Sequence, residues 1–292
     1  MSNWIYNLPM PWMTLVVFLS TYAVTGGLYW LVMRLATGER GRTFKAVSPG
    51  MLPPLGIIFG LFIAFLASQV WRDFDEAQDA VNREASALRA VVILSGTFPG
   101  EPEERMRELI RRHVQQAVTE EWPAMAQHSA TLTMIPVPLA DALRLTLSLV
   151  PHGEGQAIAQ RQIASALETA LEARRQRIII SESSVNWVKW SSVLLEALCA
   201  LVAIAMVHSD NRKAAAIAMG IFATGVAASI VLIAAHTGPF SSGISVGPDL
   251  LLQVTEVVTS RSSAAMWSDT RVTPREASAP FDGDPEPAPW HS

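Results

Sequence analysis

Four carboxylates stand close together in one stretch of the chain, at Asp73, Asp75, Glu76 and Asp79. Neighbouring carboxylates can share a proton as acid and base, and their oxygens are ligands for hard cations. The same pattern is also typical of a solvated helix face, on which the charges only meet water. We favour the solvated face, which is the commoner situation for such runs.

The histidines and the cysteine give no sign of a reactive or metal-binding site. His113, His128 and His152 have neither the H-E-x-x-H spacing nor an accompanying cysteine cluster. The single cysteine, Cys199, lies inside an apolar run, so neither a disulfide framework nor a cysteine-rich metal site is available. No G-x-S-x-G, P-loop or dinucleotide fingerprint is present. We therefore expect no catalytic, cofactor-binding or metal-binding residue, and no enzyme.

Glu196 is an ionisable residue inside an apolar run, residues 188–207. An ionised carboxylate at membrane depth is costly, so Glu196 should face the protein interior or water, or stay protonated. One interpretation is a proton or cation site. The other is a carboxyl group hydrogen-bonded to a neighbouring span, with Thr21, Thr25 and Ser229 among the possible partners. The sequence leaves both open.

An apolar stripe precedes the carboxylates. Ile57, Leu61 and Phe65 recur at every fourth position and therefore share one side of a helix. No helix breaker follows, so Pro53 to Leu94 are predicted to form one helix that begins in a bilayer and ends outside it. The stripe continues into Gln69, Arg72, Glu76, Asp79 and Arg83, and the opposite side carries Phe74, Ala77, Val81, Ala85, Leu88 and Val92. Alone, the stripe is more typical of helix packing or lipid contact than of a gate.

The stretch from Trp71 to Val92 resembles the bestrophin-like family of bacterial membrane proteins, and more distantly the bestrophin ion channels. Bestrophins carry an F-W-E-A-R-type signature after their second transmembrane helix. Phe74, Glu76 and Ala77 fit that signature, whereas Asp75 and Gln78 depart from it. The resemblance extends to two further segments, Arg174-Arg175-Gln176-Arg177 and Pro239-Phe240-Ser241-Ser242-Gly243.

This resemblance implies a function for the stripe. Ile57, Leu61 and Phe65 fall where bestrophins carry the three apolar residues of the pore neck, and Gln69, Arg72 and Glu76 would line the pore beyond it. The resemblance also implies a homo-oligomer, specifically a pentamer, with both termini and the helical domain in the cytoplasm. The acidic calcium clasp of animal bestrophins has no clear match, and Asp282, Asp284 and Glu286 are weak candidates for one.

Composition indicates a membrane protein. The 292 residues are 50% hydrophobic and 16% charged, with a mean hydropathy of +0.27, which is too little charge for an ordinary soluble domain. The net charge of −4 argues against a nucleic-acid partner. Apolar runs long enough to span a bilayer predict four transmembrane helices, at residues 13–33, 55–70, 188–207 and 214–235.

Between the second and third runs the sequence predicts further helices, including one that starts near Pro102 and is interrupted at Pro123. Arg174, Arg175 and Arg177 suit either a lipid-headgroup anchor or structural salt bridges. These patterns divide the whole chain into four predicted units. They are two transmembrane helices in 1–70, a helical extramembrane domain in 71–185, two transmembrane helices in 186–237, and a turn with a disordered tail in 238–292.

The sequence therefore predicts an all-α, multi-pass membrane protein with four transmembrane helices and an antiparallel helical extramembrane domain between spans two and three. With the resemblance, we expect an anion-conducting, bestrophin-like ion channel in the bacterial inner membrane. Its partners would be the lipid bilayer, copies of itself and small inorganic ions. The alternatives are a non-conducting membrane scaffold or sensor whose helical domain binds a partner protein, and a proton-driven motor stator.

Overall fold

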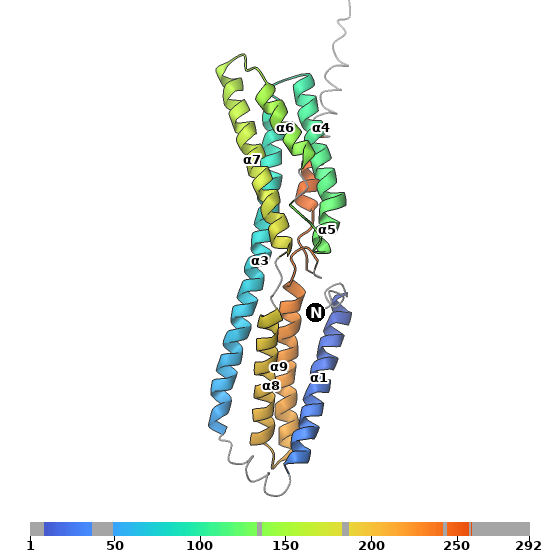
Figure 1. Ribbon diagram of the computed structural model, residues 1–292, viewed down its shortest axis with the longest axis vertical. Coiled ribbons are helices and arrows are strands. Elements are labelled where there is room, and N and C mark those ends of the chain that lie inside the picture. The colour runs from blue at the N-terminus through green and yellow to red at the C-terminus, as the bar shows by residue number, and fades with distance from the viewer. Residues whose placement is uncertain are drawn as a thin grey trace, which may run out of the picture.

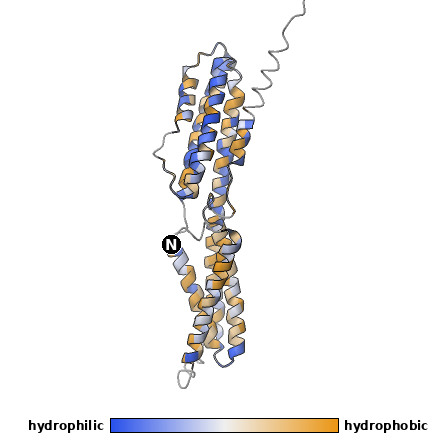
Figure 2. Cartoon of the chain, turned by 90° about the vertical axis from the view of Figure 1, so that its right-hand side faces the viewer, coloured by the Kyte–Doolittle hydropathy of each residue, from blue (hydrophilic) through white to orange (hydrophobic). Residues whose placement is uncertain are grey.

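The computed structural model describes residues 9–36, 49–132, 136–182, 187–241, 244–256 and 258 of the chain. Throughout this described part the regular elements are helical, and together they form an elongated rod (Figure 1). One end of the rod is a bundle of mostly apolar helices, whereas the other end mixes polar and apolar residues (Figure 2). The predicted all-α class is confirmed.

The apolar end consists of α1 (Met10–Leu35), the first half of α3 (Leu52–Ser95), α8 (Trp187–Val207) and α9 (Arg212–His236). These four helices are long and apolar enough to cross a membrane. Many of their large apolar side chains point outward, as contact with lipid requires, because hydrocarbon does not drive them inward as water would. The four predicted spans are therefore present, and the helix ends at the membrane lie within three residues of the predicted ones.

α9 shows how a polar cap positions a span. Asn211 is its N-cap, and the Asn211 Oδ1 accepts hydrogen bonds from the backbone N–H groups of Lys213 at 3.2 Å and Ala214 at 3.1 Å. These contacts satisfy two donors that have no partner within the helix. The apolar run that follows then enters the membrane as a helix from its first turn.

α3 connects the two ends of the rod. Its 44 residues extend roughly 66 Å at 1.5 Å per residue, about twice the hydrocarbon thickness of a bilayer. Pro53 and Pro54 lie in its first turn, where a missing N–H costs nothing. Beyond Gly60, the next glycine or proline is Gly96, immediately after the helix. We take residues 52–70 as the membrane-spanning part of α3 and residues 71–95 as its extramembrane part.

The extramembrane domain packs α4 (Glu101–Gln116), α6 (Val137–Ser148) and α7 (Glu154–Glu182) around the second half of α3. α3 and α7 run antiparallel side by side (Figure 1). α4 begins with three acidic residues that complement the positive end of its helix dipole. The core of the domain is apolar, and its fully buried members include Val81, Leu88, Ile110, Leu139, Ile163 and Leu167.

The sequence predicted that Pro123 interrupts a helix, but helical structure continues through this position. α4 passes into a π-helical turn, η2 (Ala117–Glu121), which leads directly into α5 (Trp122–Ala126). Pro123 lies in the first turn of α5, where its missing N–H is tolerated. The helix ends near His128, which adopts a positive φ of 54°. The wider π turn absorbs the irregularity that a continuous α-helix would not accommodate.

The segment after α9 returns to the extramembrane domain. Residues 249–256 are helical, and Phe240, Val246, Leu251 and Val254 are buried in the same apolar core as α3 and α7. The sequence had assigned these residues to a C-terminal unit, 238–292. Of that unit, residues 259–292, which include Asp282, Asp284 and Glu286 of the predicted tail, lie outside the described residues.

Candidate functional site

The apolar stripe of α3 lies on the outside of the single chain. Ile57, Leu61 and Phe65 are 64%, 65% and 63% exposed. The opposite side of the same segment is buried, because Leu66 and Val70 pack with side chains of α8 and α9. The bundle thus packs against one side of α3 and leaves the side that carries the stripe exposed, where it can face lipid, a lumen or another copy of the chain.

Polar groups follow the stripe immediately. Gln69, one turn beyond Phe65, accepts a hydrogen bond through its Oε1 from the Nζ of Lys189, which reaches across from α8. The Nη1 of Arg72 turns back toward the membrane and donates to the Oγ of Ser68 at 3.1 Å. The surface of α3 therefore changes from apolar to charged within one helical turn.

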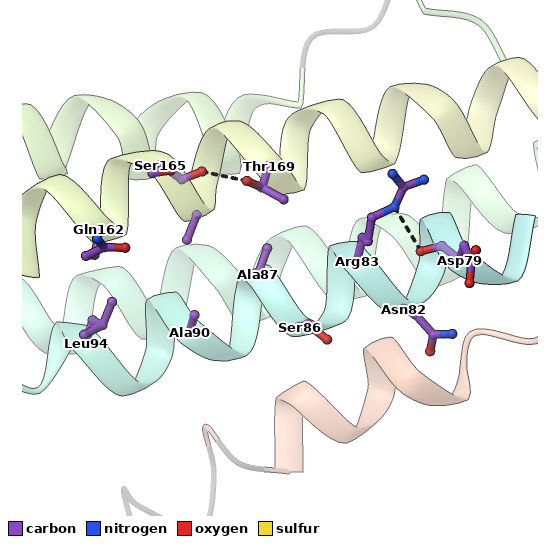
Figure 3. Close-up of a pocket in the computed structure, with 11 residues that line it drawn as sticks. Asp79, Asn82, Arg83, Ser86, Ala87, Ala90, Leu94, Gln162, Ser165 and Thr169 are labelled. Atoms are coloured by element: carbon purple, nitrogen blue, oxygen red, sulfur yellow. Dashed lines mark hydrogen bonds between the residues drawn. The ribbon is translucent and has the colours of Figure 1, made fainter. Parts of the chain in front are cut away.

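The same helix face continues along the extramembrane domain as an open groove of about 700 Å³ between α3 and α7 (Figure 3). Arg83 Nη2 donates to Gln176 Oε1 at 2.6 Å, and Arg83 Nε donates to the Asp79 carbonyl oxygen at 3.3 Å. The rest of the groove is lined by polar side chains, by Leu94 and by alanines; the polar ones are Asn82, Ser86, Gln162, Ser165 and Thr169. Arg83 lies 18 residues after Phe65, which is about five helical turns of 3.6 residues. The groove and the apolar stripe therefore lie on the same side of α3.

The helix phase predicted for the extramembrane half of α3 is observed. Glu76 and Asp79 are exposed, and Val81 and Leu88 are fully buried. Phe74 is half-buried at the edge of the core. Its ring lies 6.3 Å from that of His236, at the end of α9. The carboxylate run is thus largely a solvated face, with Asp73 half-buried at its membrane end.

A buried ionic cluster lies behind that face, at the centre of the domain. Glu84 of α3 is fully buried, and its Oε2 accepts from Arg177 Nε at 2.9 Å. Its Oε1 accepts from His113 Nε2, also at 2.9 Å. Arg177 Nη2 donates to Glu121 Oε2 at 2.8 Å, and Glu121 Oε1 accepts from Arg174 Nε at 2.7 Å. We name these five residues the Arg177 cluster.

The partners of Glu84 keep its buried carboxylate ionised. Burial alone would raise the pKa of Glu84, but the Arg177 guanidinium and the hydrogen bond from His113 outweigh burial and keep this pKa below its ordinary value. Glu84 lies outside the membrane, roughly 20 Å along α3 from Val70. A buried carboxylate that stays ionised depends on every partner, because losing one leaves a charge uncompensated.

The cluster also reaches the segment that follows α9. The Arg177 guanidinium lies 4.6 Å from the centre of the Trp122 ring, a cation–π distance. Trp122 Nε1 donates to the Val246 carbonyl oxygen at 3.2 Å, and the Phe240 ring meets the Trp122 ring edge-on at 5.7 Å. Arg177 of α7 thus contacts Glu84 of α3 directly, and it is connected to the chain beyond the fourth span through Trp122.

Sequence reasoning found only part of this cluster. For Arg174 and Arg177 it left salt bridges and a lipid anchor open, and the structure shows both as buried salt-bridge donors. Arg175 points outward beside Glu172. Glu84 was missed, although a carboxylate among the buried positions of an amphipathic helix signals a paired charge.

The remaining polar residues singled out in the sequence lie apart from both the stripe-bearing face of α3 and the Arg177 cluster. Glu196 lies in the membrane bundle with its Oε1 buried and without a hydrogen-bond partner in the described part of the chain. The hydroxyl groups of Thr25 and Ser229 donate instead to carbonyl oxygens within their own helices. His128 Nδ1 is 2.7 Å from the Ser181 carbonyl oxygen. Among the described residues, no group of three or more His, Cys, Asp or Glu could hold a metal ion.

Comparison with known proteins identifies the family and the fold of this chain. The family model of the bestrophin-like domain matches residues 19–251, which include the stripe, the groove and the Arg177 cluster. The chain belongs to the bestrophin-like family. The resemblance read from residues 71–92 is thereby confirmed over most of the chain, and no curated protein matches it in sequence.

Solved structures share the fold of this bestrophin-like chain. A crystal structure of a bacterial bestrophin homolog from Klebsiella pneumoniae, in a mutant form, is 11% identical, with a TM-score of 0.63 over 86% of this chain and 99% of that one. A second mutant of the homolog is also 11% identical, with a TM-score of 0.64 over 85% and 98% of the two chains. A structure of the homolog phased with zinc is 11% identical, with a TM-score of 0.61 over 86% and 97%.

Proposed function

We propose that this bestrophin-like protein is an ion channel, built from several copies of the chain, whose neck is lined by α3. The observation that carries the proposal is the exposure of Ile57, Leu61 and Phe65 in one line on a helix whose back is packed against α8 and α9. The family and the fold support it. The resemblance to bestrophins favours a pentamer in a bacterial inner membrane.

The continuity of α3 favours a lumen over lipid as the environment of the stripe. The same helix face passes from Phe65 to Gln69 and Arg72 and then into the polar groove beside α7. A lumen-facing helix needs such an order, with a narrow apolar constriction followed by a wider polar vestibule. A lipid-facing stripe needs no groove in line with it.

A ring of these side chains would control ion passage by excluding water. An ion must shed much of its hydration to cross an apolar constriction, and a narrow apolar pore also dewets. The edges of aromatic rings are polarised positive, so a ring of Phe65 side chains would tolerate an anion better than a cation. Enzymatic chemistry has no part in this mechanism.

A second candidate is a non-conducting scaffold or sensor whose extramembrane domain binds a protein. The observation that favours it is a larger groove of about 1300 Å³ at the far end of the domain, between α4 and α6. Side chains of both charges line it, including Arg105, Glu108, Asp141 and Arg144. A groove of this size and mixed charge suits a polar protein segment.

Purified protein in planar bilayers separates the two candidates. The mass of the detergent-solubilised particle, corrected for bound detergent, first gives the number of chains in the assembly. Single-channel recording then tests conduction by that same preparation. Discrete current steps support the channel, whereas a correctly assembled oligomer without conductance contradicts it and favours the scaffold.

A further inference from the structure

Two cations lie at the extramembrane end of the proposed neck. Lys189 places its Nζ on the Oε1 of Gln69, one helical turn beyond Phe65. Arg72 bends back along α3 so that its Nη1 contacts Ser68 Oγ at 3.1 Å. Both positive charges therefore lie at the level of residues 68 and 69, where the apolar stripe ends.

Neither cation is neutralised by an ion pair within the described residues. The ion pairs of that part of the chain lie elsewhere, in α4, α6, α7 and the Arg177 cluster. Asp73 interacts electrostatically with Lys189 and Arg72, but at longer range than an ion pair. The two hydrogen bonds fix both side chains while leaving their charge available.

The carboxylates of the same face lie farther from the neck. Glu76 is seven residues beyond Gln69, a rise of about 10 Å along the helix. That distance is close to the Debye length in physiological salt, about 8 Å, so exposed carboxylates at Asp75 and Glu76 are largely screened at the neck. A mobile ion leaving the constriction first meets the charges of Lys189 and Arg72.

We propose that Lys189 and Arg72 are the specificity-determining residues of the channel and select small inorganic anions over cations. In an assembly of several copies, these residues form a ring of positive charge at the extramembrane mouth of the neck. Such a ring concentrates anions and repels cations, and the apolar wall beside it strengthens the effect. This assignment rests on the proposed channel function and names the class of ion that the channel passes.

Reversal potentials in a NaCl gradient across a planar bilayer test the assignment. Wild type should reverse toward the chloride equilibrium potential. Lys189→Gln keeps a group that can hydrogen-bond to Gln69 but removes the charge. We expect the chloride-to-sodium permeability ratio to fall by roughly tenfold, because one charge about 6 Å away in water changes the local concentrations of an anion and of a cation by about threefold each, in opposite directions. Arg72→Gln should act in the same direction, and the double variant should lower the ratio further.

Control variants separate charge from folding. Lys189→Arg preserves the charge and the donor and should keep the wild-type ratio. Arg111→Gln removes an exposed cation that pairs with Glu108 on α4, away from α3, and should leave the ratio unchanged. Glu76→Gln should change the ratio less than Lys189→Gln does. Each variant is compared only after its assembly and melting temperature match those of wild type.

The outcomes distinguish this assignment from the proposed function. Absence of current from an assembled wild-type oligomer overturns the channel and the assignment together. Current with a ratio that is the same in wild type, Lys189→Gln and Arg72→Gln overturns the assignment alone, as does a wild-type channel that prefers sodium. A ratio that falls in Lys189→Gln and is retained in Lys189→Arg supports it.

Discussion

Replacing Arg177 with methionine tests whether the Arg177 cluster holds the extramembrane domain together. The variant removes both guanidinium contacts of Glu84, at 2.9 and 3.3 Å, and one contact of Glu121, at 2.8 Å. Glu84 would remain fully buried with His113 as its remaining cluster partner. Methionine is chosen because its length and flexibility limit the cavity that is created.

The expected cost follows from the burial of the pair. Breaking a buried ion pair by removing one partner costs about 3 to 5 kcal/mol, because the other charge stays in a low-dielectric interior. For a chain of this size, that free-energy change corresponds to a melting temperature lower by roughly 6 to 20 °C. Loss of the contact between Arg177 and the Trp122 ring adds to the cost.

The assay is thermal unfolding in detergent followed by circular dichroism, with two matched variants. Arg175→Met removes a neighbouring but exposed arginine and should change stability by less than about 0.5 kcal/mol. Combining Arg177→Met with Glu84→Gln removes both charges and should recover much of the loss, since neutralised pairs are tolerated. If Arg177→Met melts at the same temperature as Arg175→Met, the cluster does not hold the domain together and our reasoning is refuted.

Three further predictions concern other parts of the chain. In a Cys199→Ser background, a cysteine in place of exposed Glu76 should react readily with a water-soluble maleimide, and one in place of buried Val81 should not; equal labelling would mean that the phase of α3 is wrong. Because the pKa of Glu84 lies below its ordinary value, its stabilisation is complete above about pH 4.3, the pKa of an unfolded glutamate, and is lost as the pH falls through the folded-state pKa. Wild type should therefore lose thermal stability in acid more steeply than the Glu84→Gln, Arg177→Met double variant, and parallel profiles would contradict this. Since Glu196 Oε1 has no partner in the described chain, Glu196→Leu should not lower the melting temperature; a clear drop would reveal a hydrogen bond from another copy or from water.

Much of the fold could be predicted from local pattern. Uninterrupted apolar runs of about 20 residues have few stable structures other than membrane-spanning helices, so the four spans were found within a few residues. The continuity of α3 followed from the absence of glycine and proline between Val70 and Leu94. Its phase followed from the spacing of Val81 and Leu88.

The parts that were not predicted depend on contacts between distant residues. Glu84 and Arg177 are 93 positions apart, and no local periodicity reveals which buried carboxylate meets which arginine. Pro123 was predicted to end a helix because proline usually does, yet a π-helical turn placed it in a new first turn. Lys189 was unremarkable in sequence, and only the packing of α8 against α3 brings it to Gln69.

The most direct test of the central claim is single-channel recording of wild type and of a Leu61→Ala, Phe65→Ala double variant. Both side chains are exposed, so their removal should leave folding intact while widening an apolar constriction and letting water enter. We predict that the double variant assembles like wild type and carries a larger unitary current. A double variant that assembles normally and conducts no better than wild type would contradict the neck formed by α3.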